Sequence, residues 1–310
     1  MTASSHAPDR LSDLPDCLQI RAHAKTNLLL RVLAREESGY HSIETLFTLL
    51  ELHDTLVVER TADGIELDVA GADTGPVEQN LVYRAAEAVL AATGGRFGVR
   101  IALQKSIPVR AGLGGGSSDG AAALHAVNRL AGDAVPRHEI LQFAAKLGSD
   151  VAFFASGTPF ALGWSRGERL FRLPPPQAAP ALIAVPAFGI SSKEAYRLLQ
   201  VSKGSEQRRG PVVLDADSIT TWGGIGRLGG NDFETVLFGR YPELRELFEQ
   251  LAQTRPLLVR VSGSGSAIIA VYRATSDQDN AAQQIGERNH RLVKTTTRGA
   301  AAPGPEPAEM

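Results

Sequence analysis

The sequence of 310 residues contains one cysteine, Cys17, so no disulfide can form within the chain. A lone cysteine suits a reducing cytosol. The N-terminus has no basic segment followed by an apolar run, and no stretch of about 18 apolar residues occurs elsewhere. These absences exclude a disulfide-stabilised scaffold and a membrane-spanning helix, and we expect a cytoplasmic protein that does not bind membranes.

Neither sign of charge dominates the chain. Lysine and arginine together number 32, aspartate and glutamate 34, and the formal net charge is −2 with a pI near 6.4. Proteins that bind nucleic acids or membrane surfaces usually present a basic face, so we expect neither as a partner. The seven histidines show none of the spacings typical of metal ligands, such as His-Glu-x-x-His, and we predict no metal site made of protein side chains.

Glycine, by contrast, is concentrated in residues 108–120, which read Pro-Val-Arg-Ala-Gly-Leu-Gly-Gly-Gly-Ser-Ser-Asp-Gly. Apolar residues alternate with polar or small ones over 97–103, which predicts a strand before this segment, and a helical pattern follows it over 121–130. Glycines let the backbone approach a phosphate closely, and the free N–H groups of a helix N-terminus favour an anion. The three parts in this order predict a phosphate-binding loop.

The motifs that this segment lacks exclude several known classes of phosphate-binding loop. It has no lysine where the Walker pattern requires Gly-Lys-Ser/Thr, and Ser117 stands where a dinucleotide fingerprint has its third glycine. The His-Arg-Asp and Asp-Phe-Gly motifs of protein kinases are absent. Ser117 or Ser118 would cap the helix and offer a hydroxyl to a phosphate or to Mg²⁺. A flexible turn is the alternative, but a turn needs only one or two glycines.

This loop resembles the nucleotide-binding motif of the GHMP kinases, the superfamily of galactokinase, homoserine kinase and mevalonate kinase. The motif, Pro-x-x-x-Gly-Leu-Gly-(Gly/Ser)-Ser-(Ser/Ala), is matched from Pro108 to Ser118 with one extra glycine. Segments 24–30, 39–46 and 147–154 resemble those of the branch that phosphorylates 4-diphosphocytidyl-2-C-methyl-D-erythritol in the non-mevalonate isoprenoid pathway. The resemblance covers nearly the whole chain, leaving only the two tails outside it.

The resemblance implies that the loop binds ATP together with Mg²⁺. The expected ATP-binding residues are Pro108, Val109, Arg110, Ala111, Gly112, Leu113, Gly114, Gly115, Gly116, Ser117 and Ser118. Residues 262–266, Ser-Gly-Ser-Gly-Ser, resemble a third motif of the superfamily, so Gly263, Ser264 and Gly265 would turn their backbone N–H groups toward substrate phosphates. A plain hairpin turn explains these glycines equally well.

Two charged residues are the candidates for catalysis. Lys25 interrupts an apolar stretch beside Asn27, and the resemblance implies a catalytic lysine here; a solvated lysine at a strand edge is the alternative. Asp150 stands between a predicted helix and the apolar segment 151–154, either as a turn residue or as the carboxylate that accepts the proton of the substrate hydroxyl. In the second case Lys25 would keep Asp150 ionised and offset charge on the γ-phosphate.

The resemblance also implies which residues hold the cytidyl substrate. Tyr40 and Tyr196 would sandwich the cytosine ring, while His41 would read its polar edge. Asn27 and the backbone near Ser192 would hold the erythritol and diphosphate. Each aromatic residue alone is typical of ordinary packing, and the three are far apart in the sequence.

We predict an α+β fold, because strands and helices do not alternate strictly along the chain. Residues 1–16 are polar and predicted to be disordered. Residues 17–170 would form an α/β nucleotide-binding domain. Within it, 56–60 and 65–69 are predicted to pair as a hairpin around an Asp-Gly turn.

A run of prolines at 174–176 predicts the joint between two domains. Residues 171–298 then show a β-α-β-β-α-β pattern, which predicts a ferredoxin-like domain that the resemblance also implies. The tail 299–310 is rich in alanine, proline and glycine and is predicted to be disordered.

The predicted function is ATP-dependent phosphorylation of the 2-hydroxyl of this cytidyl diphosphate substrate, by a monomer or weak homodimer. Two alternatives remain open: another GHMP kinase, acting on a mevalonate-type or homoserine-type alcohol, or a metabolite sensor that keeps the fold without catalysis. Tyr40, His41 and Tyr196 favour the cytidyl substrate, since an alcohol without a base would not need them. A sensor is expected to lose Lys25 or Asp150, and both are present.

Overall fold

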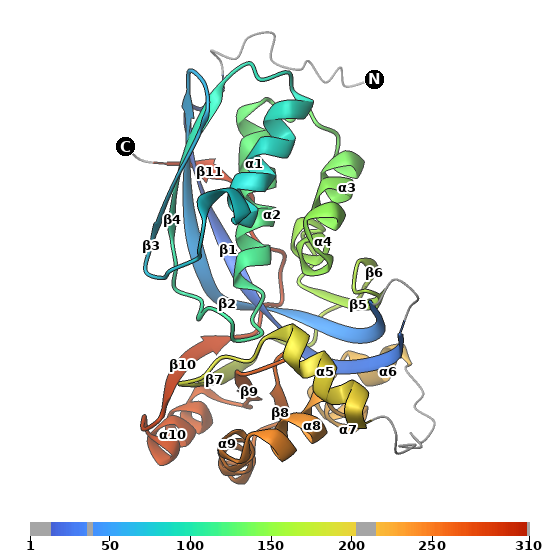
Figure 1. Cartoon of the computed structure of the whole chain (residues 1–310). Helices are drawn as coiled ribbons and strands as arrows, with labels where there is room; N and C mark the ends of the chain where they lie inside the picture. Colours follow the sequence, from blue (N-terminus) through green and yellow to red (C-terminus); the bar gives the residue numbers. More distant parts are fainter. Residues whose placement is uncertain (1–13, 36–39, 203–214, 309–310) are drawn as a thin grey trace, which may run out of the picture.

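The structure, a computed structural model, describes residues 14–35, 40–202 and 215–308. Its two halves are stacked one on the other in Figure 1. One half holds a seven-stranded sheet with helices α1 to α4, and the other holds a four-stranded sheet with helices α5 to α10. This mixture of helices with two sheets confirms the predicted α+β class.

The first half is built on two long antiparallel strands, β1 (Cys17–Arg35) and β2 (His41–Thr61). Their register shifts on either side of the segment Lys25–Asn27. Such bulges bend a strand and redirect its side chains. All three residues of this segment are buried, which sets polar side chains inside the molecule at the point where the strands are irregular.

A strand from later in the chain separates β2 from β3 (Ile65–Ala70). This strand, β4 (Gly98–Gln104), is antiparallel to β2 and parallel to β3, so the predicted hairpin is wrong. The reason is burial, because alternate residues of β4 are buried, as a central strand requires, while β3 is half exposed, as suits an edge. Gly98 allows the close entry of β4, since a Cβ there would lie 2.1 Å from the backbone of Asp63.

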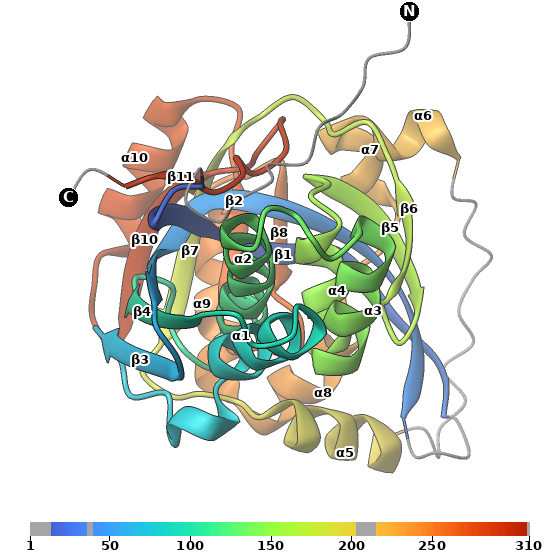
Figure 2. The same cartoon turned by 90° about the horizontal axis from the view of Figure 1, so that it is seen from above.

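Helices cover one face of this sheet (Figures 1 and 2). They are η2 (Val77–Gln79), α1 (Leu81–Ala92), α2 (Gly115–Leu130), α3 (Arg137–Leu147) and α4 (Ser149–Ala155). The sheet is completed by β5 (Phe160–Ser165) against β2 and by β6 (Arg169–Arg172) against β5. Apolar side chains of α1, α2, β2 and β4 fill the core between helices and sheet.

The C-terminal tail is ordered against the outer edge of this sheet. Strand β11 (Glu306–Pro307) pairs with Leu18 and Gln19 of β1, and Ala308 N donates to Cys17 O at 3.3 Å. The predicted disorder of 299–310 is therefore wrong for its described part, because the tail supplies partners to the backbone groups of an edge strand. Of the N-terminal segment 1–16, which was predicted to be disordered, residues 1–13 lie outside the described part of the chain.

The second half is an antiparallel sheet in the order β10-β7-β9-β8. Its strands are β7 (Pro180–Pro186), β8 (Leu258–Val261), β9 (Ile268–Val271) and β10 (His290–Thr296). Helices α5 (Ser192–Ser202) and α10 (Thr275–Ile285) complete the predicted ferredoxin-like β-α-β-β-α-β order. Between α5 and β8 the structure adds α6 (Ala216–Ile219), α7 (Trp222–Arg227), α8 (Phe233–Arg240) and α9 (Pro242–Gln253).

The two halves are joined by backbone contacts as well as by the chain. Leu30 forms a parallel bridge with Asn231, and Leu50 an antiparallel bridge with Thr297. The chain passes to the second half between β6 and β7, over 173–179, and returns to the first half between β10 and β11. The domain limits 17–170 and 171–298 stay predictions.

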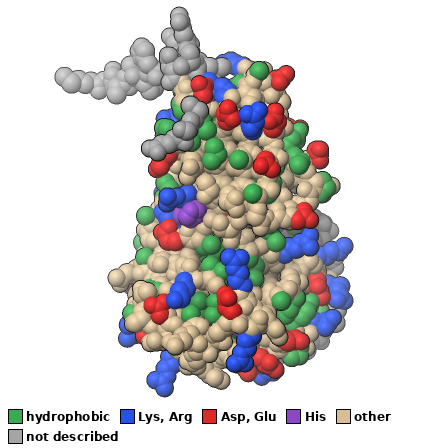
Figure 3. Space-filling model, turned by 90° about the vertical axis from the view of Figure 1, so that its left-hand side faces the viewer, with side chains coloured by type: hydrophobic (Ala, Val, Ile, Leu, Met, Phe, Trp, Pro, Cys, Tyr) green, Lys and Arg blue, Asp and Glu red, His purple; other side chains and the backbone are tan. Residues whose placement is uncertain are grey.

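The surface in Figure 3 shows basic and acidic side chains interspersed over the described residues of one face, in keeping with the small net charge. No helix within the described ranges is both long and apolar enough to cross a membrane.

Candidate active site

A cavity of about 1310 Å³ opens where the two halves meet, and most of the predicted site residues line it. These residues are Lys25, Asn27, Tyr40, His41, 108–117, Asp150, Ser192, Tyr196, Gly263 and Ser264. Two predicted residues, Ser118 and Gly265, are described but do not form part of this wall. Positions that are far apart in the sequence are therefore brought to one site.

The predicted catalytic pair lies together on this wall. Lys25 Nζ is 3.1 Å from Asp150 Oδ2, across 125 positions of the sequence, and the lysine side chain is only 5% exposed. Lys25 Nζ also donates to Asn27 Oδ1 at 2.8 Å, and Lys25 N donates to Leu113 O at 2.9 Å. The ammonium is thus fixed beside the carboxylate and attached through its backbone to the glycine-rich loop.

Asn27 is held by a chain of hydrogen bonds that orients its amide. Its Nδ2 donates to Thr45 Oγ1 at 2.7 Å, and this hydroxyl donates to Leu29 O at 2.7 Å. The amide oxygen is therefore turned toward Lys25. Asn27 lines the cavity as predicted, although its main contact is with the lysine.

Close approaches that only glycine permits shape the loop. Gly112 and Gly114 have φ of 79° and 71°. A Cβ on Gly112 would lie 2.1 Å from Ser262 O, and one on Gly114 would lie 2.9 Å from Lys25 Cγ. Ser262 Oγ also donates to Gly112 O at 2.9 Å. The segment 262–266 therefore packs directly on the loop and is more than a hairpin turn.

The start of α2 differs from the prediction for the two serines. Gly114 is the N-cap and the helix begins at Gly115, so neither Ser117 nor Ser118 caps it. Consecutive glycines allow the helical turn to begin before the serines are reached. Ser118 Oγ donates inward to His23 O at 2.7 Å, whereas Ser117 lines the cavity. The N–H groups of Gly115, Gly116 and Ser117 lack helical partners, as at every helix N-terminus, which suits an anion.

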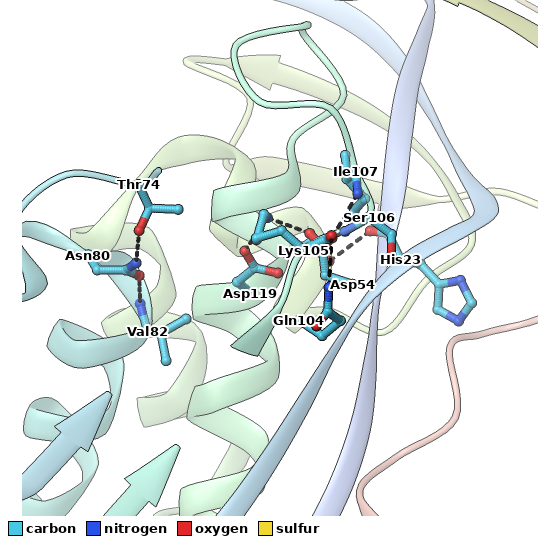
Figure 4. Close-up of polar contacts among 11 residues, drawn as sticks. His23, Asp54, Thr74, Asn80, Val82, Gln104, Lys105, Ser106, Ile107 and Asp119 are labelled. Carbon is cyan, nitrogen blue, oxygen red and sulfur yellow. Dashed lines mark hydrogen bonds and ion pairs between the residues drawn. The ribbon is translucent and has the colours of Figure 1, made fainter. Parts of the chain in front are cut away.

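Three ionisable side chains under the loop were not foreseen (Figure 4). Lys105 Nζ contacts Asp54 Oδ2 and donates to Asp119 Oδ2 at 2.6 Å, and all three residues are buried. Lys105 continues the inward alternation of β4 in steps of two, and this was a signal that the sequence offered. Asp119 Oδ1 has no hydrogen-bond partner in the described part of the chain.

Burial governs the ionisation of this cluster. It raises the pKa of Asp119 to about 8, against the opposing attraction of Lys105, and the charge of Asp54 adds to the rise. For Lys105, burial lowers the pKa, but the two carboxylates together outweigh it and raise this pKa above its usual value. Lys105 is therefore charged, and burial makes Asp119 a weaker acid than an exposed aspartate.

Three predicted substrate residues lie on another part of the wall. The rings of His41 and Tyr196 stack at 4.5 Å between centroids, and Tyr196 meets Phe233 edge-on at 4.9 Å. Tyr40 is 58% exposed, with the Arg166 guanidinium 4.1 Å from its ring centroid. Burial, followed by the nearby charge of Asp150, raises the pKa of Tyr196 to about 12, so its phenol stays neutral.

Several polar residues around this part of the wall were missed. Arg166, Lys193 and Arg197 line the cavity, and their charges suit an anionic ligand. Lys193 and Arg197 directly follow the predicted Ser192 and Tyr196, so their position beside the motif was an available signal. Ser192 Oγ and Ser264 Oγ are 2.9 Å apart, which joins α5 to the 262–266 segment.

No group of three or more histidine, cysteine, aspartate or glutamate side chains that could hold a metal occurs among the described residues. Mg²⁺ commonly keeps several waters and binds through phosphate oxygens with one or two protein oxygens. Ser117 at the start of α2 is such an oxygen on the cavity wall. The residues present thus fit a Mg²⁺ ion that arrives with a nucleotide.

The chain is similar to known proteins over most of its length. The models of the GHMP kinases N terminal domain and the GHMP kinases C terminal domain match residues 80–158 and 217–291. The 4-diphosphocytidyl-2-C-methyl-D-erythritol kinase of Pelotomaculum thermopropionicum is 39% identical over 272 residues, covering 87% of this chain and 93% of that protein. The Moorella thermoacetica kinase of the same name is 36% identical over 285 residues, covering 91% and 99%.

Solved structures are also similar to this chain over most of its length. A crystal structure of 4-(cytidine 5'-diphospho)-2C-methyl-D-erythritol kinase matches with a TM-score of 0.77 and 34% identity, covering 90% of this chain and 98% of that one. Homoserine kinase from Cytophaga hutchinsonii matches with a TM-score of 0.67 and 18% identity, covering 94% and 97%. The second likeness shows the shared fold alone.

Proposed function

We propose that Lys25 and Asp150 carry out the phosphoryl transfer of this chain, which belongs to the GHMP kinases and to their 4-diphosphocytidyl-2-C-methyl-D-erythritol kinase family. The chain is an ATP-dependent small-molecule kinase, and its acceptor is the 2-hydroxyl of 4-diphosphocytidyl-2-C-methyl-D-erythritol in the non-mevalonate isoprenoid pathway. The observation that carries the proposed site is the contact at 3.1 Å between the buried Lys25 and the partly exposed Asp150 beside the glycine-rich loop.

In this mechanism the protein mainly positions groups and neutralises charge. The Asp150 carboxylate orients the 2-hydroxyl and accepts its proton as the hydroxyl oxygen bonds to the γ-phosphorus. The bond from this phosphorus to the bridging oxygen of ADP breaks in the same displacement. Lys25, whose Nζ is 3.1 Å from this carboxylate, offsets charge on the transferred group. Its hydrogen bond to Asn27 supports this role, because it fixes the ammonium before substrate arrives.

ATP would place its phosphates at the N-terminus of α2, against the N–H groups of Gly115, Gly116 and Ser117. Ser117 would help to hold a Mg²⁺ ion that arrives with ATP, and such an ion would reduce the charge of the phosphates. The base of ATP would bind in the part of the cavity beyond Lys105 and Asp119, where Thr74 and Asn80 line the wall.

The cytidyl group would lie among Tyr40, His41 and Tyr196. Stacking of a base on an aromatic ring contributes about 1–3 kcal/mol, and a group that pairs with the polar edge adds discrimination. Arg166 and Arg197 support a place for the diphosphate nearby, since both line the same cavity and carry positive charge. Ser192, Gly263 and Ser264 would complete this binding site.

The test is ATP turnover with a panel of alcohols that includes the cytidyl diphosphate substrate, mevalonate and homoserine, with the phosphorylated product identified by mass. We expect turnover with the cytidyl substrate. Turnover with mevalonate or homoserine alone would contradict the proposal, and ATP binding without turnover on any alcohol would favour a sensor.

A further inference from the structure

A buried carboxylate holds the segment that leads into the glycine-rich loop. Asp54, in the middle of β2, is fully buried. Its Oδ1 accepts hydrogen bonds from Ser106 N at 2.5 Å and Ile107 N at 2.8 Å, and its Oδ2 contacts Lys105 Nζ (Figure 4). One side chain therefore holds the three residues immediately before Pro108.

The same contacts continue to the helix that follows the loop. Lys105 Nζ donates to Asp119 Oδ2 at 2.6 Å, and Asp119 lies in the second turn of α2. Asp54, Lys105 and Asp119, which we call the loop clamp, thus connect the segment before Pro108 with the helix after Ser118. Residues 108–118 form the loop between these two fixed ends.

The loop clamp also contacts the interior of the loop. A Cβ on Gly115 would lie 3.2 Å from Lys105 Nζ and 3.1 Å from Ile107 Cγ2. The first residue of α2 therefore rests on the ammonium group and on a residue held by Asp54. Any shift of Lys105 or Ile107 would move the N–H groups at the start of α2.

Stability alone does not account for this arrangement. Removing three ionisable groups from water is costly, and well-packed apolar residues often stabilise a core as well or better. A phosphate site, in contrast, requires its donors to be held in place before the ligand arrives, and small displacements weaken binding. The loop clamp supplies such fixation from beneath the loop, and Asp54 is not part of the cavity wall.

We propose that Asp54 is a positioning residue for ATP: through Ser106, Ile107 and Lys105 it fixes both ends of the glycine-rich loop. This inference rests on the proposed function, in which the loop binds the phosphates of ATP. The loop N–H groups contact these phosphates before and during transfer, so the effect falls on ATP binding. Binding of the alcohol, which relies on other parts of the wall, is largely independent of it.

Two variants of Asp54 separate its contacts. Asp54→Ala removes the acceptor of the two backbone N–H groups and the charge beside Lys105, whereas Asp54→Asn keeps an oxygen for the N–H groups. We expect the KM for ATP to rise about tenfold or more in Asp54→Ala and about threefold in Asp54→Asn, with the KM for the cytidyl substrate within about twofold of wild type.

Val58→Ala is the matched control, because Val58 is fully buried in the same strand and pairs with Ile101 of β4, away from the segment 105–107. It should lower the melting temperature and leave the KM for ATP unchanged. An equal rise in both KM values of the Asp54 variants, or no rise for ATP, would overturn the proposal. Absence of turnover in the wild type would instead overturn the proposed function.

If Asp54→Ala does not fold, Asp54→Asn carries the test with hydrogen–deuterium exchange. Amides over 105–117 should exchange faster in this variant than in wild type, while those of the second half keep their rates. Unchanged exchange together with an unchanged KM for ATP would exclude a positioning role.

Discussion

The phosphate region and the cytidyl region of the cavity are held in different ways. The phosphate region, made of Lys25, residues 108–118 and the loop clamp, is fixed by buried contacts; Lys25 is 4% exposed and Asp54 fully buried. The cytidyl region, made of Tyr40, His41, Arg166, Ser192 and Tyr196, is assembled from partly or fully exposed side chains, with ring contacts between His41 and Tyr196 and between Arg166 and Tyr40. Tyr40, for example, is 58% exposed.

This difference corresponds to different chemical demands. Phosphoryl transfer needs donors and charges that are in position before the reaction, because reorganising them costs free energy in the transition state. Recognition of a base away from the reacting hydroxyl contributes similarly to the ground and transition states. Damage to the phosphate region should therefore reduce kcat or ATP binding, while damage to the cytidyl region should raise the KM for the alcohol.

The largest effect is expected for the charge that touches the reacting hydroxyl. Asp150→Asn should lower kcat by about 100-fold or more and leave ATP binding nearly intact, because the amide cannot accept the hydroxyl proton. Single-turnover kinetics and ATP titration would measure the two quantities. Lys25→Ala should show the same pattern. A variant at position 150 that retains most of its kcat would remove Asp150 from the mechanism.

A backbone change in the phosphate region should act mainly on ATP. Gly112→Ala places a Cβ 2.1 Å from Ser262 O at a φ of 79°, so the loop or the 262–266 segment must move. We expect the KM for ATP to rise about tenfold or more, equivalent to about 1.4 kcal/mol.

Gly116→Ala is the structural control for this prediction, because nothing lies within 4 Å of the added Cβ. Its melting temperature should equal that of wild type, and that of Gly112→Ala should be lower. Equal melting temperatures and equal ATP binding in the two variants would show that the contact between the loops is dispensable.

The sequence predicted the position of the glycine-rich loop, after a strand and before a helix, because the signals for it are local. Glycines at close backbone approaches, a preceding strand and a following helix are all contiguous along the chain, and they recover residues 108–117 on the cavity wall. The β-α-β-β-α-β order of the second half also followed from local periodicity. The pairing of Lys25 with Asp150 could not be derived this way and came from the resemblance alone.

The features that were missed depend on distant partners. Asp54 gives no local signal, since the residues it holds are 51 to 53 positions away. The insertion of β4 between β2 and β3 is decided by which strand buries its apolar face more completely, and a turn sequence does not contain this information. The inward direction of Ser118 likewise follows from its contact with β1.

The cytidyl region should respond to substitution in KM and not in kcat. Tyr196→Ala removes the ring that stacks on His41, and we expect the KM for the cytidyl substrate to rise about tenfold, with kcat and the KM for ATP little changed. Tyr196→Phe is the control, because it keeps the ring and loses only the hydroxyl. If Tyr196→Ala binds and turns over the substrate like wild type, the cytosine lies elsewhere.

The smallest change in turnover is expected for Asp119→Asn, a variant that tests the ionisation of Asp119 in the phosphate region. The amide keeps an oxygen for Lys105, so activity near neutral pH should change little. Stability should nevertheless change with pH, because burial raises the pKa of Asp119 to about 8 in the folded state. Between its unfolded pKa and about 8, the folded wild type binds a proton that the unfolded chain has lost, and its stability falls as pH rises.

Asp119→Asn lacks this titration, so its melting temperature relative to wild type should increase from pH 5 to pH 8 and level off above. Differential scanning calorimetry at several pH values would measure the difference. Tyr40→Phe, in the exposed cytidyl region, should keep the pH dependence of wild type. A difference in melting temperature that stays constant from pH 5 to pH 8 would instead mean that Asp119 is ionised in the fold and that its attraction to Lys105 outweighs the cost of burial. All three side chains of the loop clamp would then be charged. The phosphate region would differ from the cytidyl region more strongly than the raised pKa of Asp119 indicates.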